Sequence, residues 1–223
     1  MKKKSLLTMV AALALVGAVG VGATLAYLSD ATGEMTNTFT VGSGIDMKQD
    51  ESDESTPDNP DDRTEKGNDY TDIKPGDVLV KDPTVTIIKN STECYVFMQL
   101  SGADALAAQN FAFGGFDATK WIKVDENGDE VDTTKDATLD GVYRYYKTVK
   151  KSSDDQKLES LFKTVTYSIN AEELEEGVTL SNVVIKSCAV QADNIEKAYE
   201  GSTAEQAAYK AAYNTAFKSI TEE

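Results

Sequence analysis

The chain of 223 residues contains no histidine. This absence excludes Ser-His-Asp triads, Cys-His dyads and the H-E-x-x-H zinc motif, because each of them needs an imidazole as a base or a ligand. Carboxylates alone do not supply the ligands that zinc ordinarily uses in proteins. We therefore predict no catalytic residues, no metal ligands and no cofactor-binding residues, and we expect that the protein is not an enzyme.

Cysteine is also scarce, with only Cys94 and Cys188 in the chain. An exported protein can form a disulfide between them. Such a bond closes a loop of about 95 residues and contributes roughly 4 kcal/mol in the chain-entropy model. Both cysteines also lie in apolar runs that are typical of strands, so both can equally be buried free thiols. The sequence leaves these two alternatives open.

The N-terminus has the three parts of a secretory signal peptide. Residues 2–4 are lysines, residues 5–25 are mostly apolar, and Ala26 is the small residue that cleavage requires. The apolar run is long enough to span a bilayer, so a permanent anchor is the alternative. No basic stop-transfer cluster follows it, which favours cleavage. We expect residues 1–26 to be a signal peptide that is cut before Tyr27, so that the protein is secreted and meets the membrane only during export.

The net charge is −16, and it falls to −16 − 3 = −19 without residues 1–26, which hold three lysines and no acid. Such a charge repels nucleic acid and anionic lipid headgroups, so neither is an expected partner. Residues 46–72 hold eleven Asp or Glu against three Lys or Arg, together with Pro57 and Pro60. This composition predicts an acidic flexible loop at residues 48–73. Its carboxylates can bind divalent cations weakly and without specificity.

Strand signals lie on both sides of this loop. Residues 27–47 are expected to hold an N-terminal strand, and residues 74–193 contain several short β-rich segments separated by turns. The apolar run at residues 94–100 predicts a central strand, and Asn127-Gly128 predicts a hairpin turn. We therefore expect a mainly β chain that folds as an antiparallel β-sandwich with a few short helices.

Residues 194–223 change to a helical period. Ser202-Thr203-Ala204-Glu205 has the pattern of a capping box. The apolar stripe that follows consists of Tyr209, Tyr213, Phe217 and Ile220. We expect a C-terminal amphipathic helix that docks on the domain, while a groove of a partner is the alternative.

Two segments carry a resemblance to a known family. The first surrounds the expected cleavage site and reads Thr24-Leu25-Ala26-Tyr27-Leu28-Ser29-Asp30. The second follows it and reads Asn37-Thr38-Phe39-Thr40-Val41-Gly42. Together they resemble the TasA/camelysin family of Gram-positive bacteria, whose signal is cut by a dedicated signal peptidase. The Lys74-Pro75-Gly76-Asp77 turn and the tyrosine-rich strand near Tyr145 resemble later parts of the same pattern.

The resemblance implies a jelly-roll arrangement and a secreted structural protein of the cell surface or biofilm matrix. Family fibres assemble by donating an N-terminal strand to the next subunit, so the expected partners are other copies of the chain or other matrix proteins. The candidate donor strand contains Met35, Asn37, Phe39 and Val41. The alternative for this strand is pairing within its own domain.

Two other functions remain as alternatives. The camelysin name implies a secreted hydrolase, which the absence of histidine disfavours. A carbohydrate-binding adhesin would need an exposed aromatic platform, for which Trp121 is the one candidate, although a lone tryptophan is more often a core residue. No LPxTG-like sorting motif occurs, so covalent attachment to the cell wall is not expected.

Overall fold

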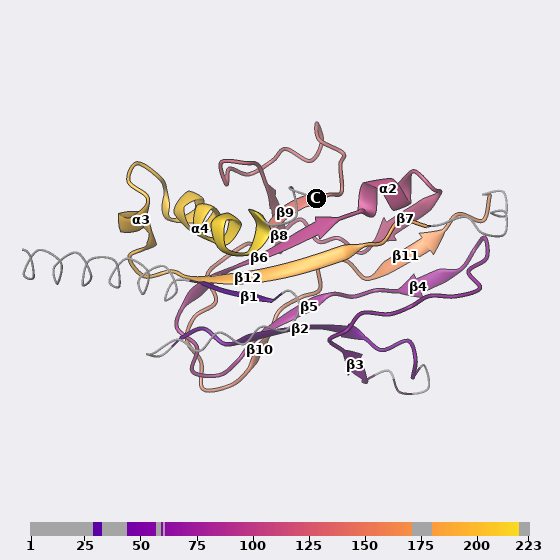
Figure 1. Ribbon diagram of the computed structural model, residues 1–223, viewed down its shortest axis with the longest axis horizontal. Helices are drawn as coiled ribbons and strands as arrows, with labels where there is room; N and C mark the ends of the chain where they lie inside the picture. The colour runs from indigo at the N-terminus through magenta and orange to yellow at the C-terminus, as the bar shows by residue number, and fades with distance from the viewer. Residues whose placement is uncertain (1–28, 33–43, 57–58, 60, 171–179, 219–223) are drawn as a thin grey trace, which may run out of the picture.

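The computed structural model describes residues 29–32, 44–56, 59, 61–170 and 180–218 (Figure 1). In these ranges the chain is mainly β, with three antiparallel sheets and a few short helices, which confirms the predicted class. The five-stranded sheet has the order β1 (Ser29–Thr32), β12 (Val184–Gln191), β6 (Cys94–Ser101), β9 (Gly141–Tyr145) and β8 (Trp121–Val124). The four-stranded sheet has the order β10 (Gln156–Lys157), β5 (Thr84–Ile87), β2 (Met47–Ser52) and β3 (Arg63–Thr64). The three-stranded sheet has the order β4 (Val78–Val80), β11 (Thr164–Tyr167) and β7 (Phe111–Gly114).

Strand β6 lies at the centre of the five-stranded sheet, as its apolar sequence predicts. Alternate side chains of β6 enter two different hydrophobic clusters. The first cluster contains Val96, Met98 and Leu100, and the second contains Tyr95 and Phe97. Because apolar residues cover both faces of β6, the strand shows a nearly continuous apolar run instead of alternation with polar residues.

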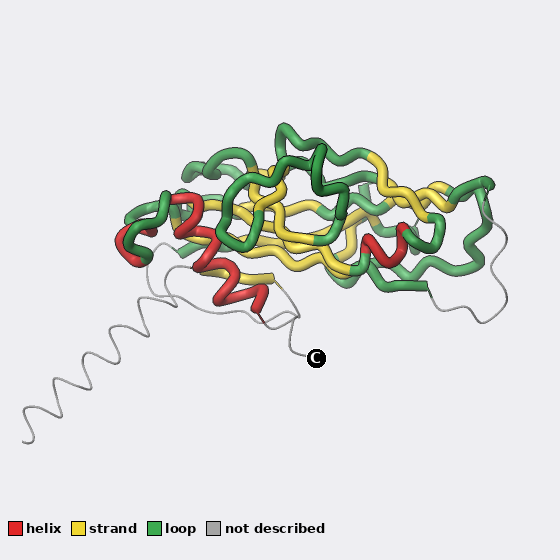
Figure 2. The backbone as a smooth tube through the Cα atoms, turned by 90° about the horizontal axis from the view of Figure 1, so that it is seen from above, coloured by secondary structure: helices red, strands yellow, loops and turns green. Residues whose placement is uncertain are grey.

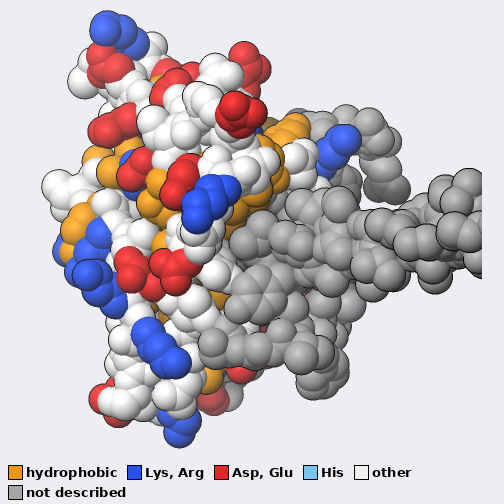
Figure 3. Space-filling view, turned by 90° about the vertical axis from the view of Figure 1, so that its left-hand side faces the viewer, with side chains coloured by type: hydrophobic (Ala, Val, Ile, Leu, Met, Phe, Trp, Pro, Cys, Tyr) orange, Lys and Arg blue, Asp and Glu red, His pale blue; other side chains and the backbone are white. Residues whose placement is uncertain are grey.

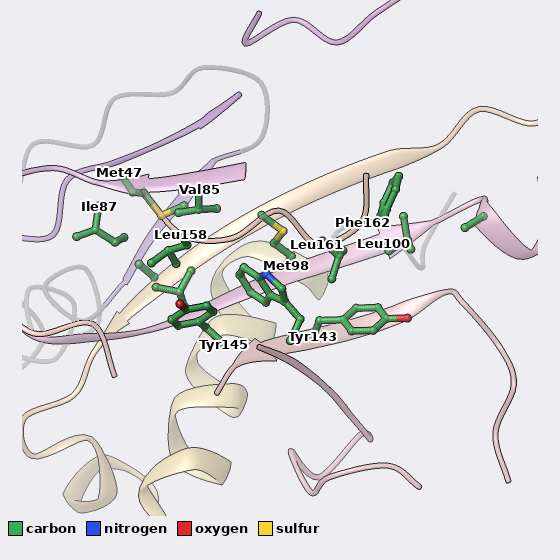
Figure 4. Packing of buried hydrophobic residues seen from close by; sticks show 14 of the residues in the cluster. Met47, Val85, Ile87, Met98, Leu100, Tyr143, Tyr145, Leu158, Leu161 and Phe162 are labelled. Atoms are coloured by element: carbon green, nitrogen blue, oxygen red, sulfur yellow. The ribbon is translucent and has the colours of Figure 1, made fainter. Parts of the chain in front are cut away.

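The first cluster fills the space between the five-stranded and four-stranded sheets (Figure 4). Met47 of β2 and Val85 of β5 point toward Met98 and Tyr145 on the facing sheet. Val85 and Met98 are fully buried, as expected for the centre of a hydrophobic core.

The second cluster lies on the opposite face of the five-stranded sheet, beneath the C-terminal helices. These are α3 (Ile195–Ala198), α4 (Ala204–Ala212) and the π-helical turn η1 (Tyr213–Phe217), whereas the short α2 (Ala103–Ala107) precedes β7. Tyr209 and Phe217 are buried, and the Tyr209 ring meets Phe97 edge to face at 6.3 Å between centroids. Figure 2 shows α4 along one side of the strands. The predicted docking of the C-terminal helix on the domain is therefore confirmed.

The predicted start and continuity of that helix need correction. The capping box is formed by Thr203 and Gln206, one residue later than the Ser202–Glu205 pair that the sequence suggested. Glutamine can replace glutamate at the third helical position. Its side-chain carbonyl accepts a hydrogen bond from the N–H of Thr203 at 2.9 Å. Residues 194–218 form three helical segments instead of one helix, and Ile220 lies outside the described residues.

Pro83 separates two strands that belong to different sheets. Strand β4 ends at Val80 and pairs with β11, whereas β5 begins at Thr84 and pairs with β2 and β10. Proline cannot donate a ladder hydrogen bond, which is consistent with a break at this position. The preceding turn at residues 74–77 forms as predicted, with Asp77 N–H donating to the Lys74 carbonyl at 3.0 Å.

The predicted hairpin turn at residues 125–129 also forms. Gly128 has a positive φ of 86°, a conformation that favours glycine. Gly128 N–H donates to the Asp125 carbonyl at 3.0 Å, and the Asp125 carboxylate accepts the N–H groups of Asn127 and Asp129. The second arm of this hairpin contributes only an isolated bridge between Glu130 and Val124. Strand β8 instead pairs along its length with β9.

The loop predicted at residues 48–73 needs correction at residues 48–52 and 63–64, which form strands. Strand β2 continues to Ser52 and pairs with β5, and β3 adds to the edge of β2. Asp50 and Glu51 are each only 5% exposed, so the acidic segment is part of the folded body. The physical reason is that distant cations neutralise these carboxylates, as the next subsection describes.

The N-terminal strand is described only in part. Residues 29–32 form β1, a strand that the sequence did not indicate. The rest of the segment 27–47, which was expected to hold a strand, falls mostly outside the described residues. Residues 44–46 are not in a strand, and Met47 begins β2. Within the described ranges, the structure has no helix of the length and hydropathy that a bilayer crossing demands. The predicted signal segment lies outside those ranges.

Candidate functional site

Strand β1 occupies an outer edge of the five-stranded sheet. It pairs antiparallel with β12, with Ser29 opposite Val190 and Thr32 opposite Ser187. β1 begins two residues after Tyr27, the expected first residue of the mature chain. An edge strand is held by ladder hydrogen bonds on one side alone, so it is the type of strand that can be exchanged.

Strand β12 extends beyond the part that β1 covers. It pairs with β6 along residues 184–191 but with β1 only along residues 187–190. Gln49 of β2 reaches this edge from the four-stranded sheet. Its Nε2 donates to the Ile185 carbonyl at 3.2 Å, and its Oε1 accepts a hydrogen bond from the Ser187 hydroxyl. These two bonds tie the edge of one sheet to the other.

A cavity of about 220 Å³ lies beside this edge. Val184 and Ile185 of β12 form part of one wall, and Glu51 and Lys81 form part of the other. Val184 is 45% exposed, so it adds apolar surface beside the cavity. Among the described residues, the end of β12 that lies beyond β1 therefore combines a backbone edge, apolar surface and an adjacent cavity.

Arg63 organises the acidic side of this region. Its Nε donates to the Asp50 carboxylate at 2.5 Å, and its Nη1 donates to the Asp82 carboxylate at 2.8 Å. Its Nη2 also donates to the Asp50 and Asp82 carbonyl groups. Lys81 adds a second buried pair, with its ammonium 2.9 Å from a Glu51 carboxylate oxygen. These long-range pairs hold β3 and the end of β2 against the segment between β4 and β5.

The pKa of Asp82 reflects this network. Burial alone would raise the pKa of this carboxyl group. Hydrogen bonds from the Arg63 guanidinium and the Ser52 N–H, together with the positive charge of Arg63, outweigh burial and hold the pKa below the usual 3.8. Asp82 therefore remains ionised in the folded protein at neutral pH.

The aromatic residues are packed into the body. Trp121 is 2% exposed, and its indole N–H donates to the Glu159 carbonyl at 2.8 Å. A buried ring cannot stack on a sugar at the surface, so Trp121 is not the carbohydrate platform considered above. Tyr145 packs against Trp121. The ammonium groups of Lys120 and Lys147 lie 4.7 Å and 5.0 Å from the centroid of the Tyr146 ring. A hydrogen bond with Lys147 lowers the pKa of Tyr146.

The two cysteines are buried and are not joined by a disulfide, so the disulfide alternative is not the arrangement found. Cys94 pairs with Gln191, and Cys188 pairs with Phe97, which places the cysteines three residues apart in register. An odd offset puts them on opposite faces of the sheet. Cys94 accordingly belongs to the first hydrophobic cluster and Cys188 to the second. Burial raises the pKa of the Cys94 thiol to about 12.

Acidic residues do not gather into a metal site in the described part of the chain. No three His, Cys, Asp or Glu side chains in those ranges are placed to hold a metal ion together. Asp125, Asn127 and Asp129 have the spacing of the first three ligands of a calcium loop, but the Asp125 carboxylate accepts hydrogen bonds from the turn itself. On the face in Figure 3, acidic and basic side chains are interspersed, so this face has no large surface of one charge.

The sequence located the elements of the body better than the details of the site. Ala26, Tyr27 and the donor residues Met35, Asn37, Phe39 and Val41 lie outside the described residues. The pairing of β1 with β12 and the Arg63 network were missed. Arg63 is the single arginine within the acidic stretch, and an arginine surrounded by carboxylates is a usable signal for a buried ion-pair network.

Comparison with known proteins adds no relative: no family model, no curated protein and no solved structure matches the chain.

Proposed function

We propose that the protein is a secreted structural protein of the bacterial cell surface or biofilm matrix. In this proposal a subunit assembles with other copies by exchanging its N-terminal strand at the outer edge of β12, within a jelly-roll-like sandwich. The pairing of β1 with β12 is the observation that carries it, because the N-terminal segment of the expected mature chain already lies on a sheet edge. The sequence resemblance to the TasA/camelysin family supports the same function.

Physical chemistry makes such an exchange reasonable. Strand β1 is four residues long and forms ladder hydrogen bonds with one neighbouring strand, β12. Few backbone hydrogen bonds therefore hold it in place. A β1 strand from a second copy would form the same bonds with the same β12. The free-energy difference between the closed and exchanged states is therefore small, and concentration can shift the balance. The extension of β12 beyond β1 offers additional edge to a longer incoming strand.

Export would control the timing of this reaction. Residues 1–26 precede β1 directly in the sequence, and their removal leaves an N-terminus two residues from the strand. We propose that a dedicated signal peptidase makes this cut, so that assembly follows secretion. Residues Met35, Asn37, Phe39 and Val41 extend the proposed donor segment. A charge at Phe39 should then prevent assembly, because burying this side chain in the acceptor would contribute roughly 1.5–3 kcal/mol.

Electron microscopy of the protein beginning at Tyr27 tests this function. We expect fibres that form faster with salt or divalent cations, because these screen the repulsion between subunits of charge near −19. A variant that begins at Gly33 lacks β1 and should remain monomeric. Normal fibres from that variant would refute the proposal, and so would a mature protein that stays monomeric at high concentration with calcium down to its isoelectric range. A casein assay of the same samples, with and without a chelator, tests the hydrolase alternative.

A further inference from the structure

Strand β2 carries a buried carboxylate that bonds to two different nitrogen-bearing side chains. The Glu51 carboxylate accepts hydrogen bonds from the Lys81 ammonium at 2.9 and 3.1 Å. One of its oxygens, Oε1, also accepts a hydrogen bond from Nδ2 of Asn68 at 3.1 Å. Because Lys81 Nζ and Asn68 Nδ2 bond to the same oxygen atom, an amine and a side-chain amide are neighbours around Glu51.

This lysine and glutamate are more deeply buried than the other lysine–carboxylate pairs of the described ranges. The Lys81 side chain is 11% exposed and the Glu51 side chain 7%, whereas each of the other pairs has a member that is at least 40% exposed. Two charges cost free energy in a buried site, and the transfer of one proton from the ammonium to the carboxylate leaves two neutral groups. The amine that results is a nucleophile, and the carboxylic acid beside it is a proton donor.

The Asn68 side chain is held by three hydrogen bonds that fix its orientation. Its Nδ2 donates to the Ser52 carbonyl at 2.8 Å as well as to Glu51, and its Oδ1 accepts a hydrogen bond from the Glu54 N–H at 2.9 Å. The amide nitrogen therefore faces the carboxylate, and the amide oxygen faces a backbone donor. A backbone N–H in this position stabilises the negative charge that the oxygen gains when the amide carbon is attacked.

We propose that Lys81 and Asn68 become joined by an isopeptide bond, with Glu51 as the general acid and base. The neutral amine of Lys81 attacks Cγ of Asn68, and the Glu54 N–H stabilises the negative charge on Oδ1. Glu51 gives its proton to Nδ2 and takes up the proton that Nζ loses. The Nζ–Cγ bond forms, the Cγ–Nδ2 bond breaks and ammonia leaves, so the reaction needs no oxidant and no other reactant.

The surroundings of these residues suit the modification. Glu51 and Lys81 line the cavity of about 220 Å³ beside β12, which can receive the ammonia. The Lys81 N–H donates to the Lys163 carbonyl at 3.1 Å, so the backbone of the nucleophile is fixed. The bond ties the segment after β3 to the segment after β4. It does not depend on strand exchange, because β1 contributes none of these residues.

Mass spectrometry of the intact protein gives a direct test. The native protein should be lighter than its sequence mass by one ammonia. Lys81→Arg, Asn68→Ala and Glu51→Gln should each have the full mass of their own sequences. Glu65→Gln is the control, because Glu65 also lines the cavity but pairs with Lys48, and this variant should keep the loss of ammonia.

Tryptic peptides of the native protein locate the bond without any variant. Trypsin does not cut after a lysine whose amine is part of an amide, and it does not cut after Lys74, which precedes a proline. Residues 67–89 should therefore remain one peptide that is lighter by one ammonia.

Other outcomes would overturn the proposal. A native protein of full sequence mass excludes the bond. A loss of ammonia together with normal cleavage after Lys81 identifies a succinimide at Asn68, and this loss would persist in Lys81→Arg. A loss of water in place of ammonia identifies a direct bond between Lys81 and Glu51. A loss of ammonia that persists in Glu51→Gln contradicts the role of Glu51 as acid and base.

Discussion

Ala31 of β1 lies directly opposite Cys188 of β12 in the antiparallel register. The N-terminal strand therefore passes beside one of the two cysteines, while Cys94 lies on the other face of the sheet. This register places the Cys188 position directly at the proposed assembly edge.

The native cysteines should remain reduced in the folded protein. Their side chains lie on opposite faces of the sheet, so a bond between them would require rearrangement of β6 or β12. We expect two alkylated thiols after denaturation without reductant, and slow alkylation before it because burial raises the pKa of Cys94 to about 12. Mass spectrometry makes the comparison. A chain two hydrogens lighter that resists alkylation would show that the disulfide forms.

Replacing Arg63 by methionine should destabilise the fold. The substitution leaves Asp50, whose side chain is 3% exposed, without its guanidinium partner. Removal of one partner from a buried pair costs roughly 3 kcal/mol, which urea unfolding can measure. Lys135→Met breaks a pair in which the lysine is 82% exposed, and this control should change stability by less than about 0.5 kcal/mol. Equal losses of unfolding free energy in Arg63→Met and Lys135→Met would contradict the role assigned to Arg63.

Asp82 should make stability depend on pH in the acidic range. Its pKa is lower in the folded protein than the usual 3.8, so its contribution is present above that value and is lost as pH falls through the folded pKa. Asp82→Asn should therefore lower the urea midpoint at pH 7 and have little effect once Asp82 is protonated. The measurement is the difference in urea midpoint between the native protein and Asp82→Asn from pH 7 down to pH 2. A difference that stays constant over this range would rule out the predicted linkage.

The C-terminal helices should contribute to the stability of the five-stranded sheet. Phe217 is fully buried in the second hydrophobic cluster, so Phe217→Ala should cost roughly 3–5 kcal/mol. The exposed neighbour Asn214 provides the control, because Asn214→Ala removes no core contact. Thermal and urea unfolding of both variants give the comparison. A neutral Phe217→Ala would mean that η1 does not dock in solution.

The sequence predicted those parts of the fold that depend on local patterns. Residues 94–100 are continuously apolar and form the central strand, and Asn127-Gly128 forms its turn because glycine takes the positive φ. The acidic segment was misjudged because its structure depends on pairs such as Arg63 with Asp82, which are 19 residues apart. The sequence around Pro83 likewise could not show that this proline divides two sheets, since sheet membership is decided by pairing with distant strands. For the candidate site, the sequence indicated the N-terminal region but not the strand at residues 29–32.

Disulfide trapping across β1 and β12 tests strand exchange most directly. One chain carries Ala31→Cys and Cys188→Ser, the other keeps its native Cys188, and Cys94→Ala is present in both. Opposed residues of an antiparallel pair lie about 4.5–5.5 Å apart between Cα atoms, which suits a disulfide. A bond between residue 31 and residue 188 can then form only between two molecules. Ser29→Cys, which lies opposite Val190, is the control.

Oxidation of the mixed chains under assembly conditions is followed on a non-reducing gel. Strand exchange predicts covalent pairs that join residue 31 of one chain to residue 188 of the other, and far fewer pairs with Ser29→Cys. Fibres that assemble from the mixture while both chains remain uncrosslinked would contradict exchange of β1 between subunits.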